Sequence, residues 1–173
     1  NQISLVLKPV SCREVSEIIK VCAENEIKIY PISKGKNYGF GSKLPVKDQN
    51  VVLDLSLLNK ITAFDESFGF VRVQPGVTFQ DLHDYLEKSG SNLMLNVIGG
   101  SPQASVLGNI LERGDGNGRH GDRSKYICNL EVVLPNGKII HTGHGNLINA
   151  QTANIFDHGV GPNFDQAFIQ SNL

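Results

Sequence analysis

The residues best suited to chemistry are glycines in three clusters, of which the first spans residues 31–42. It reads PISKGKNYGFGS and combines three glycines with two serines and an asparagine. Such a loop can turn its backbone N–H groups inward and bind an anion, and glycine lets a phosphate approach closely because it has no Cβ. The same composition also suits an ordinary surface loop. The cluster contains neither a Walker A sequence nor a GxGxxG fingerprint.

The two later clusters cover residues 99–109 (GGSPQASVLGN) and 113–123 (RGDGNGRHGDR). The second cluster leads into a predicted helix start, where backbone donors can meet an anion, although taken alone it is better explained as a loop with a capped helix. The third begins like a calcium loop, but Arg119 occupies a ligand position and His120 the position of the invariant glycine. We therefore assign no metal site.

Composition excludes several classes of protein. The 173 residues carry a formal net charge of -1, which disfavours a nucleic-acid binder and a polybasic membrane-surface protein. No apolar run approaches the roughly 20 residues that span a bilayer, and the first residues do not resemble a signal peptide. Three scattered cysteines fit a reducing compartment, so we expect a cytoplasmic protein.

The elements that must position these clusters begin with a strand over residues 3–7. Ser11 and Glu14 form a capping-box pattern ahead of an amphipathic helix over residues 12–25. Strands are predicted at residues 27–30 and 51–55, and the long crossover between strands favours parallel pairing.

After residue 59 the pattern changes to antiparallel. Two strands separated by a polar turn are predicted first, and Thr78 then caps a second helix. A short helix over residues 104–112 follows. Residues 126–134 and 138–141 indicate a hairpin around Pro-Asn-Gly.

Several segments, in order and spacing, resemble the vanillyl-alcohol oxidase/p-cresol methylhydroxylase flavoprotein family, and most closely its branch that oxidises 4-alkylphenols. They are residues 31–41, 51–55 (VVLDL), 74–77 (QPGV), 81–86 (DLHDYL), 105–109 (SVLGN), 113–114, 121–122, 130–137 (LEVVLPNG) and 161–172 (GPNFDQAFIQSN).

The resemblance implies an α+β fold of the p-cresol methylhydroxylase type with FAD between two α+β subdomains. The first, residues 1–58, would hold a small parallel sheet and the pyrophosphate loop. The second, residues 59–173, would hold a mainly antiparallel sheet with flanking helices. A substrate or cap domain is absent from the sequence, so we expect a cap-domain partner or a homo-oligomer, and a chain that is incomplete for catalysis by itself.

The resemblance also implies which residues bind FAD. The pyrophosphate loop would contribute Ile32, Ser33, Lys34, Gly35, Lys36, Asn37 and Tyr38. The adenosine and ribityl path would be lined by Pro75, Gly76, Ser105, Gly108, Asn109, Glu131 and Val132. Gly114, Gly121 and Asp122 would approach the flavin. The loop at residues 31–42 contains no histidine that could attach FAD, so within this segment we expect non-covalent binding.

Departures from the family concern the chemistry. Phe40 stands where the phenol-oxidising relatives have a tyrosine that holds a phenolate, and Arg123 stands where a histidine is usual. Residues 99–104 contain no acid in place of the catalytic aspartate of the alcohol-oxidising members. We assign no catalytic residue. The sequence thus predicts the FAD-binding domain of a flavin-dependent oxidoreductase; the alternative is a non-catalytic nucleotide-binding or interaction module.

Overall fold

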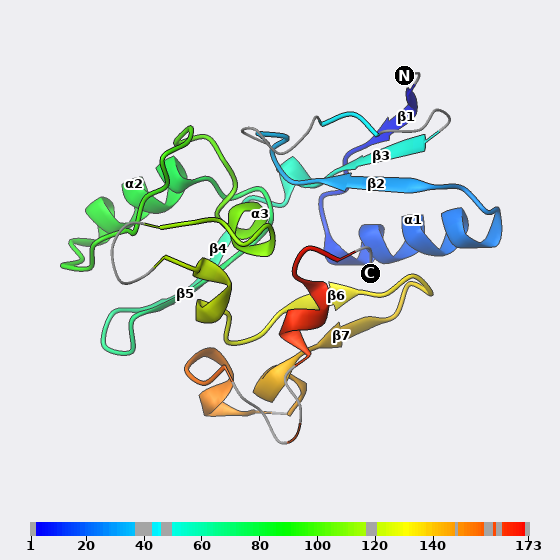
Figure 1. Ribbon diagram of the computed structural model, residues 1–173. Coiled ribbons are helices and arrows are strands. Elements are labelled where there is room, and N and C mark those ends of the chain that lie inside the picture. Colours follow the sequence, from blue (N-terminus) through cyan, green and yellow to red (C-terminus); the bar gives the residue numbers. More distant parts are fainter. Residues whose placement is uncertain are drawn as a thin grey trace.

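The computed structural model describes residues 3–36, 43–45, 50–116, 121–147, 149–157, 161 and 164–171. Within these residues the chain forms a 3-stranded parallel sheet and two 2-stranded antiparallel sheets, with helices packed against them (Figure 1). The parallel sheet comes first and the antiparallel hairpins follow. This order confirms the predicted α+β fold class.

The first lobe consists of β1 (Ile3–Leu7), α1 (Cys12–Glu24), β2 (Ile29–Ile32) and β3 (Asn50–Asp54). The strand order is β1-β3-β2, and α1 supplies the crossover that parallel neighbours require. The central strand β3 has an almost continuous run of apolar residues because it is covered on both faces.

A hydrophobic core holds the first lobe together. Val15 of α1 packs with Leu53 and Leu58, each less than 10 % exposed. The Ser11 hydroxyl accepts the N–H of Glu14 (3.2 Å) and so caps α1. The Glu14 carboxylate accepts the N–H of Val10 (2.9 Å), one residue before the position that a capping box predicts.

The second lobe consists of the hairpin β4 (Ile61–Asp65) and β5 (Phe70–Val73) with α2 (Phe79–Ser89) and α3 (Val106–Leu111). A complete capping box at Thr78 and a left-handed glycine after Ser89 define the two ends of α2. The core of this lobe comprises Val77, Phe79, Leu82, Leu86, Ala104 and Val106.

The third sheet is the hairpin of β6 (Glu131–Val133) and β7 (Ile139–His141). It contacts the first lobe, because Val133 packs against the first core and the Ser16 hydroxyl donates to the Gly137 carbonyl (2.5 Å). The hairpin makes these contacts although it follows the division expected near residue 58. That division stays a prediction.

Of the strand expected at residues 126–134, the structure confirms only Glu131–Val133; residues 127–130 are irregular and the expectation is wrong there. A 3-10 helix occupies Arg123–Tyr126, because the Asp122 carboxylate accepts the N–H of Ser124 and caps it. Further 3-10 helices at Gly143–Asn146, Gln151–Asn154 and Asp165–Phe168 had no periodic signal in the sequence. None of the helices in the described part of the chain has the length and apolar character needed to cross a bilayer.

Candidate functional site

The candidate site forms where the two lobes meet, around the first residues of α3. Ser105 is the N-cap of this helix, and its hydroxyl accepts the N–H of Gly108 (2.9 Å). The same hydroxyl donates to the carbonyl of Pro75 (2.6 Å). One side chain therefore fastens the turn after β5 to the start of α3.

Gly76 fixes this turn against the end of the first lobe. Its N–H donates to the Leu58 carbonyl (2.6 Å), and a Cβ at Gly76 would stand 2.5 Å from the Ser56 carbonyl oxygen. Backbone atoms cannot give way as a flexible side chain can, so only glycine fits here.

The loop after β2 reaches α3 through Ser33. A Cβ at Gly108 would lie 2.6 Å from the Ser33 hydroxyl oxygen. Ile32 ends β2 opposite Asp54, and Gly35 has a φ of +62°. Lys34 is half-buried and Lys36 is exposed. Asn37 and Tyr38, like Phe40, lie outside the described residues.

Asn109 lies within α3 and contacts Gly114, which follows the end of the helix. The Gly114 N–H donates to the Asn109 carbonyl (2.7 Å), and the Asn109 amide packs directly against the Gly114 backbone. The buried Oδ1 of Asn109 has no hydrogen-bond partner among the described residues. A buried amide oxygen of this kind is a free acceptor, suited to a ligand hydroxyl.

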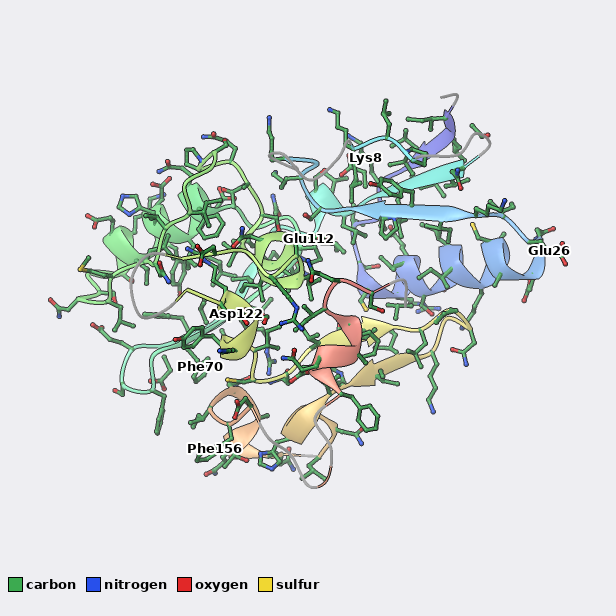
Figure 2. The ribbon with its side chains drawn as sticks, in the orientation of Figure 1. Lys8, Glu26, Phe70, Glu112, Asp122 and Phe156 are labelled. Carbon is green, nitrogen blue, oxygen red and sulfur yellow. The ribbon has the colours of Figure 1, made fainter. Side chains whose placement is uncertain are left out.

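These contacts unite Ser33, Pro75, Ser105, Gly108, Asn109 and Gly114, which we call the junction cluster. Its members come from three stretches that are distant in sequence: the loop after β2, the turn after β5 and residues 105–114. In Figure 2, Glu112 and Asp122, which flank the cluster, lie toward the middle of the view, whereas Glu26 and Phe156 lie at its edge.

Gly121 and Asp122 lie next to the part of the junction cluster that contains Gly114, because they pair with the two residues that follow Gly114. The Gly116 N–H donates to the Gly121 carbonyl (2.7 Å), and Asp115 pairs with Asp122 as an antiparallel bridge. The Ser124 hydroxyl donates to the Asp122 carboxylate (2.6 Å). This bond, with the nearby Arg113 charge, lowers the pKa of Asp122 and favours the carboxylate form.

Glu131 and Val132 are not brought to the junction cluster by their side-chain contacts. The Glu131 carboxylate lies 3.6 Å from the His141 ring, and burial together with this carboxylate raises the pKa of the Cys12 thiol. Val132 pairs with Ile140 within the hairpin. A role for these residues in cofactor binding stays a prediction.

Sequence reasoning missed the contacts of Arg123. Its side chain is only 6 % exposed, its guanidinium lies 5.0 Å from the centre of the Phe79 ring, and it donates to the Asn96 carbonyl (2.5 Å). Burial lowers the pKa of Arg123 from its usual high value. The only signal in the sequence was the replacement of the family's histidine, and it did not reveal these partners.

The chemistry of the junction cluster suits a dinucleotide. Gly108 allows the Ser33 hydroxyl, a donor, to pack against the start of α3, and the Asn109 Oδ1 is an acceptor without a partner among the described residues. Two lysines follow Ser33 in the same loop and supply positive charge. A diphosphate needs the donors and the charge, whereas a sugar or ribityl chain needs acceptors. The residues present therefore fit FAD.

Comparison with known proteins agrees with this geometry. Residues 3–143 match the family described as FAD binding domain. The chain belongs to this family. The match confirms the family and the cofactor that the sequence analysis expected.

Two curated relatives and one solved structure refine the comparison. The chain is 44% identical over 173 residues to 1'-carboxy-chondrochloren decarboxylase of Chondromyces crocatus, covering 100% of this chain and 32% of the relative. It is 37% identical to the 4-cresol dehydrogenase [hydroxylating] flavoprotein subunit of Pseudomonas putida, covering 98% and 32%. The structure of p-cresol methylhydroxylase with substrate bound superposes with a TM-score of 0.93 at 36% identity, over 96% of this chain and 32% of that one.

The chain thus spans about a third of the length of the curated relatives it matches. The fold agreement extends over nearly the whole of this FAD-binding domain, and it confirms the p-cresol methylhydroxylase type of fold.

Proposed function

We propose that FAD binds across the junction cluster, with its diphosphate beside Ser33 and Gly108 and its flavin toward Gly114, Gly121 and Asp122. The observation that carries this proposal is the contact of Ser33 with Gly108, because it joins the glycine loop to α3 at a point with no room for a Cβ. The other candidate residues belong to the same proposal: Ile32, Lys34, Gly35, Lys36, Asn37, Tyr38, Pro75, Gly76, Ser105, Asn109, Glu131 and Val132.

The chain's own residues bind and orient the cofactor. The Ser33 hydroxyl supplies a donor, and Lys34 and Lys36 attract the diphosphate. The Asn109 Oδ1 supplies an acceptor for a ligand hydroxyl. FAD, when bound, supplies the redox chemistry, and the protein supplies position and electrostatics.

For the whole protein we propose a flavin-dependent oxidoreductase that acts on aromatic substrates of the 4-alkylphenol or aromatic alcohol type. The name of one curated relative, the 4-cresol dehydrogenase [hydroxylating] flavoprotein subunit, supports a flavoenzyme of this branch. The three cysteines are free, which suits our proposal of a cytoplasmic protein. Exposed apolar side chains such as Met94 and Phe68 support a cap domain or a second copy as partner.

The test is a titration of the purified protein with FAD, ADP and riboflavin, followed by flavin fluorescence or calorimetry. We expect FAD to bind most tightly, ADP more weakly and riboflavin least. Gly108→Ala should weaken both FAD and ADP binding at least about tenfold, which is about 1.4 kcal/mol.

Gly99→Ala is the matched control, because a Cβ at Gly99 would meet no atom within 4 Å. Equal FAD affinity of the Gly108→Ala variant and the parent would place the diphosphate elsewhere. In the whole protein, tight FAD binding without substrate-dependent bleaching of the flavin would favour the non-catalytic nucleotide-binding module.

A further inference from the structure

Arg113 occupies a strained position at the C-terminal end of α3. Its φ of 52° lies in the left-handed region, where helices usually place glycine. This conformation is unfavourable for a residue with a Cβ and persists only where neighbouring contacts impose it. Arg113 therefore has contacts that outweigh its backbone strain.

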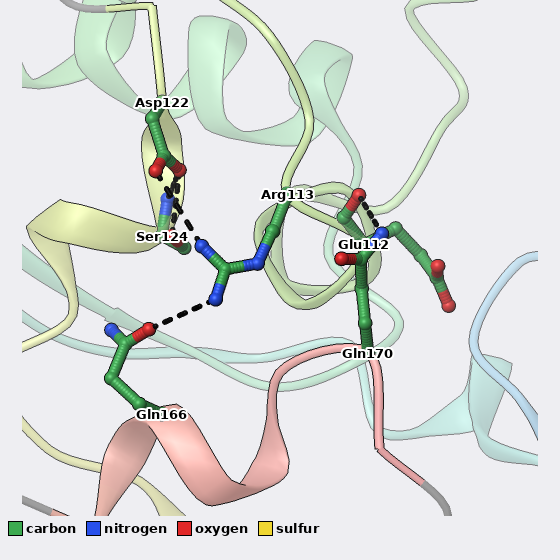
Figure 3. Close-up of polar contacts among 6 residues, drawn as sticks. All are labelled: Glu112, Arg113, Asp122, Ser124, Gln166 and Gln170. Atoms are coloured by element: carbon green, nitrogen blue, oxygen red, sulfur yellow. Dashed lines mark hydrogen bonds and ion pairs between the residues drawn. The ribbon is translucent and has the colours of Figure 1, made fainter.

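The Arg113 guanidinium bridges two segments that are distant in sequence (Figure 3). One nitrogen, Nη1, lies 3.7 Å from the Asp122 carboxylate, and the other, Nη2, donates to the Gln166 side-chain oxygen (3.3 Å). Asp122 belongs to the edge that we propose for the flavin, and Gln166 belongs to the segment at residues 164–171.

The segment at residues 164–171 also closes the end of α3. Gln170 is likewise left-handed, with a φ of 50°, and its N–H donates to the Leu111 carbonyl (2.9 Å). Its side chain donates to the Glu112 carbonyl (3.4 Å), so it satisfies helix carbonyls that would lack a partner. Arg113 thus stands between this segment and the candidate site.

The segment has anchors that do not involve Arg113. Ile169 is 5 % exposed, and the Thr142 hydroxyl donates to the fully buried Asp165 carboxylate. Loss of the Arg113 side chain should therefore loosen the segment at Gln166 and leave the fold intact.

The Asp122 edge is joined to Arg113 through the ion pair and through the neighbouring backbone. The next residue, Gly114, accepts the N–H of Arg123 at its carbonyl (3.3 Å), and Asp122 is held by Ser124 on its other side. A shift of Arg113 changes both the backbone at Gly114 and the ion pair at Asp122.

We propose that Arg113 is a positioning residue that couples the segment at residues 164–171 to the flavin end of the FAD site. Docking of the segment and occupation of the flavin end then stabilise one another through Arg113. The inference rests on the proposed function, and it adds a coupling that FAD, but not ADP, will exert on the segment.

The experiment measures FAD and ADP affinity together with hydrogen exchange at residues 164–171. In the parent protein, FAD should slow exchange in this segment and ADP should not. Arg113→Ala should weaken FAD binding by roughly three- to tenfold, as loss of a half-exposed ion pair and a hydrogen bond allows, while ADP affinity stays within about twofold. FAD should no longer protect the segment in this variant.

Two further variants separate coupling from general damage. Gln166→Ala keeps the pair of Arg113 with Asp122 but breaks the bond of Arg113 to the segment. It should lose the FAD-dependent protection and, because coupling is reciprocal, weaken FAD binding too, but less than Arg113→Ala does, with ADP affinity unchanged. Arg13→Ala removes another exposed arginine ion pair, that with Glu17 on α1, and should change neither quantity. The folded state of each variant is checked by its thermal midpoint.

The outcomes distinguish this inference from the proposed function. A parent protein that binds neither FAD nor ADP overturns the proposed function. A parent that binds FAD, with an Arg113→Ala variant that loses FAD and ADP affinity equally or retains full FAD-dependent protection, overturns the coupling alone.

Discussion

Ser33 and Gly108 approach so closely that a Cβ on Gly108 would stand 2.6 Å from the Ser33 hydroxyl oxygen. This distance is far below an ordinary van der Waals contact, so one side chain must be minimal for the other to fit. The contact joins the first lobe to the second beside the N-cap Ser105. The Cβ and the hydroxyl oxygen of Ser105 each lie 3.3 Å from the same Cβ position. The fold and the candidate site therefore depend on the same pair.

We predict that this pair is energetically coupled. Gly108→Ala should lower the free energy of unfolding by about 1–3 kcal/mol through overpacking. Ser33→Gly in the same chain should recover part of that loss, because it removes the hydroxyl that the new Cβ meets. A double-mutant cycle by urea unfolding measures the coupling. Strict additivity of the two changes would show that the clash is relieved elsewhere.

Gly35 and Lys36 provide a second test, which separates the contribution of the loop backbone to FAD binding from that of the loop's positive charge. The φ of +62° at Gly35 and a Cβ position 2.8 Å from the Lys43 Cβ both oppose a branched side chain. Gly35→Val should abolish FAD binding, because the loop can no longer hold its shape. Lys36→Ala should weaken it by less than about tenfold, since an exposed lysine contributes only screened attraction.

The two variants are compared by FAD titration under one salt condition. Raising the salt concentration should reduce the difference in FAD affinity between Lys36→Ala and the parent, because ionic screening weakens the attraction between Lys36 and the diphosphate. If Gly35→Val binds FAD as the parent does, the loop does not contact the cofactor.

The sequence was sufficient to predict the helices that carry local signals, namely an N-cap residue and apolar residues at helical spacing. Ser11 and Thr78 stand at the first turns of α1 and α2, each followed by apolar residues at helical spacing, and both helices begin where predicted. The fold type and cofactor followed from the ordered segments that resemble the flavoprotein family, and the family match confirms them.

The rest depended on contacts between distant residues. The bond from Arg113 to Gln166 spans 53 positions, and the approach of Ser33 to Gly108 joins two lobes. Neither leaves a periodic or capping signal, because only the packing of the lobes brings these residues together. The 3-10 helix at Arg123–Tyr126 was missed for a related reason: it is set by a single cap at Asp122 rather than by apolar spacing.

Asp54 gives a prediction for stability in acid. Burial by itself raises the pKa of this carboxyl, but hydrogen bonds from Ser56 and the Lys8 ion pair at 3.2 Å outweigh it and lower the pKa overall. A lowered native pKa stabilises the fold above the unfolded pKa of about 4 and stops doing so as the pH falls through the native value.

Asp54→Asn should therefore be less stable than the parent at pH 7, by less than about 1 kcal/mol because the pair is partly exposed. The difference should vanish near pH 2, where both proteins lack the charge. Thermal unfolding at several pH values measures it. A constant difference across this range would mean that Asp54 acts through packing rather than through its charge.

Cys12 should be an unreactive thiol although its side chain is only partly buried. Burial, together with the hydrogen bond to Glu131 and the charge of that carboxylate, raises the pKa of Cys12 to about 12. Only the thiolate reacts, so about a thousandfold less of the reactive form is present at pH 8 than for a thiol with the ordinary pKa of 9.0.

The test is alkylation with iodoacetamide, followed by peptide mass spectrometry. Cys12 should stay unlabelled under conditions that label a thiol with the ordinary pKa. Glu131→Gln should accelerate the reaction, because it removes the negative charge that opposes ionisation while burial still holds the pKa above its ordinary value. FAD affinity measured on the same variant also tests Glu131 as a cofactor residue. Rapid labelling of Cys12 in the folded parent would show that the thiol does not donate to Glu131 in solution.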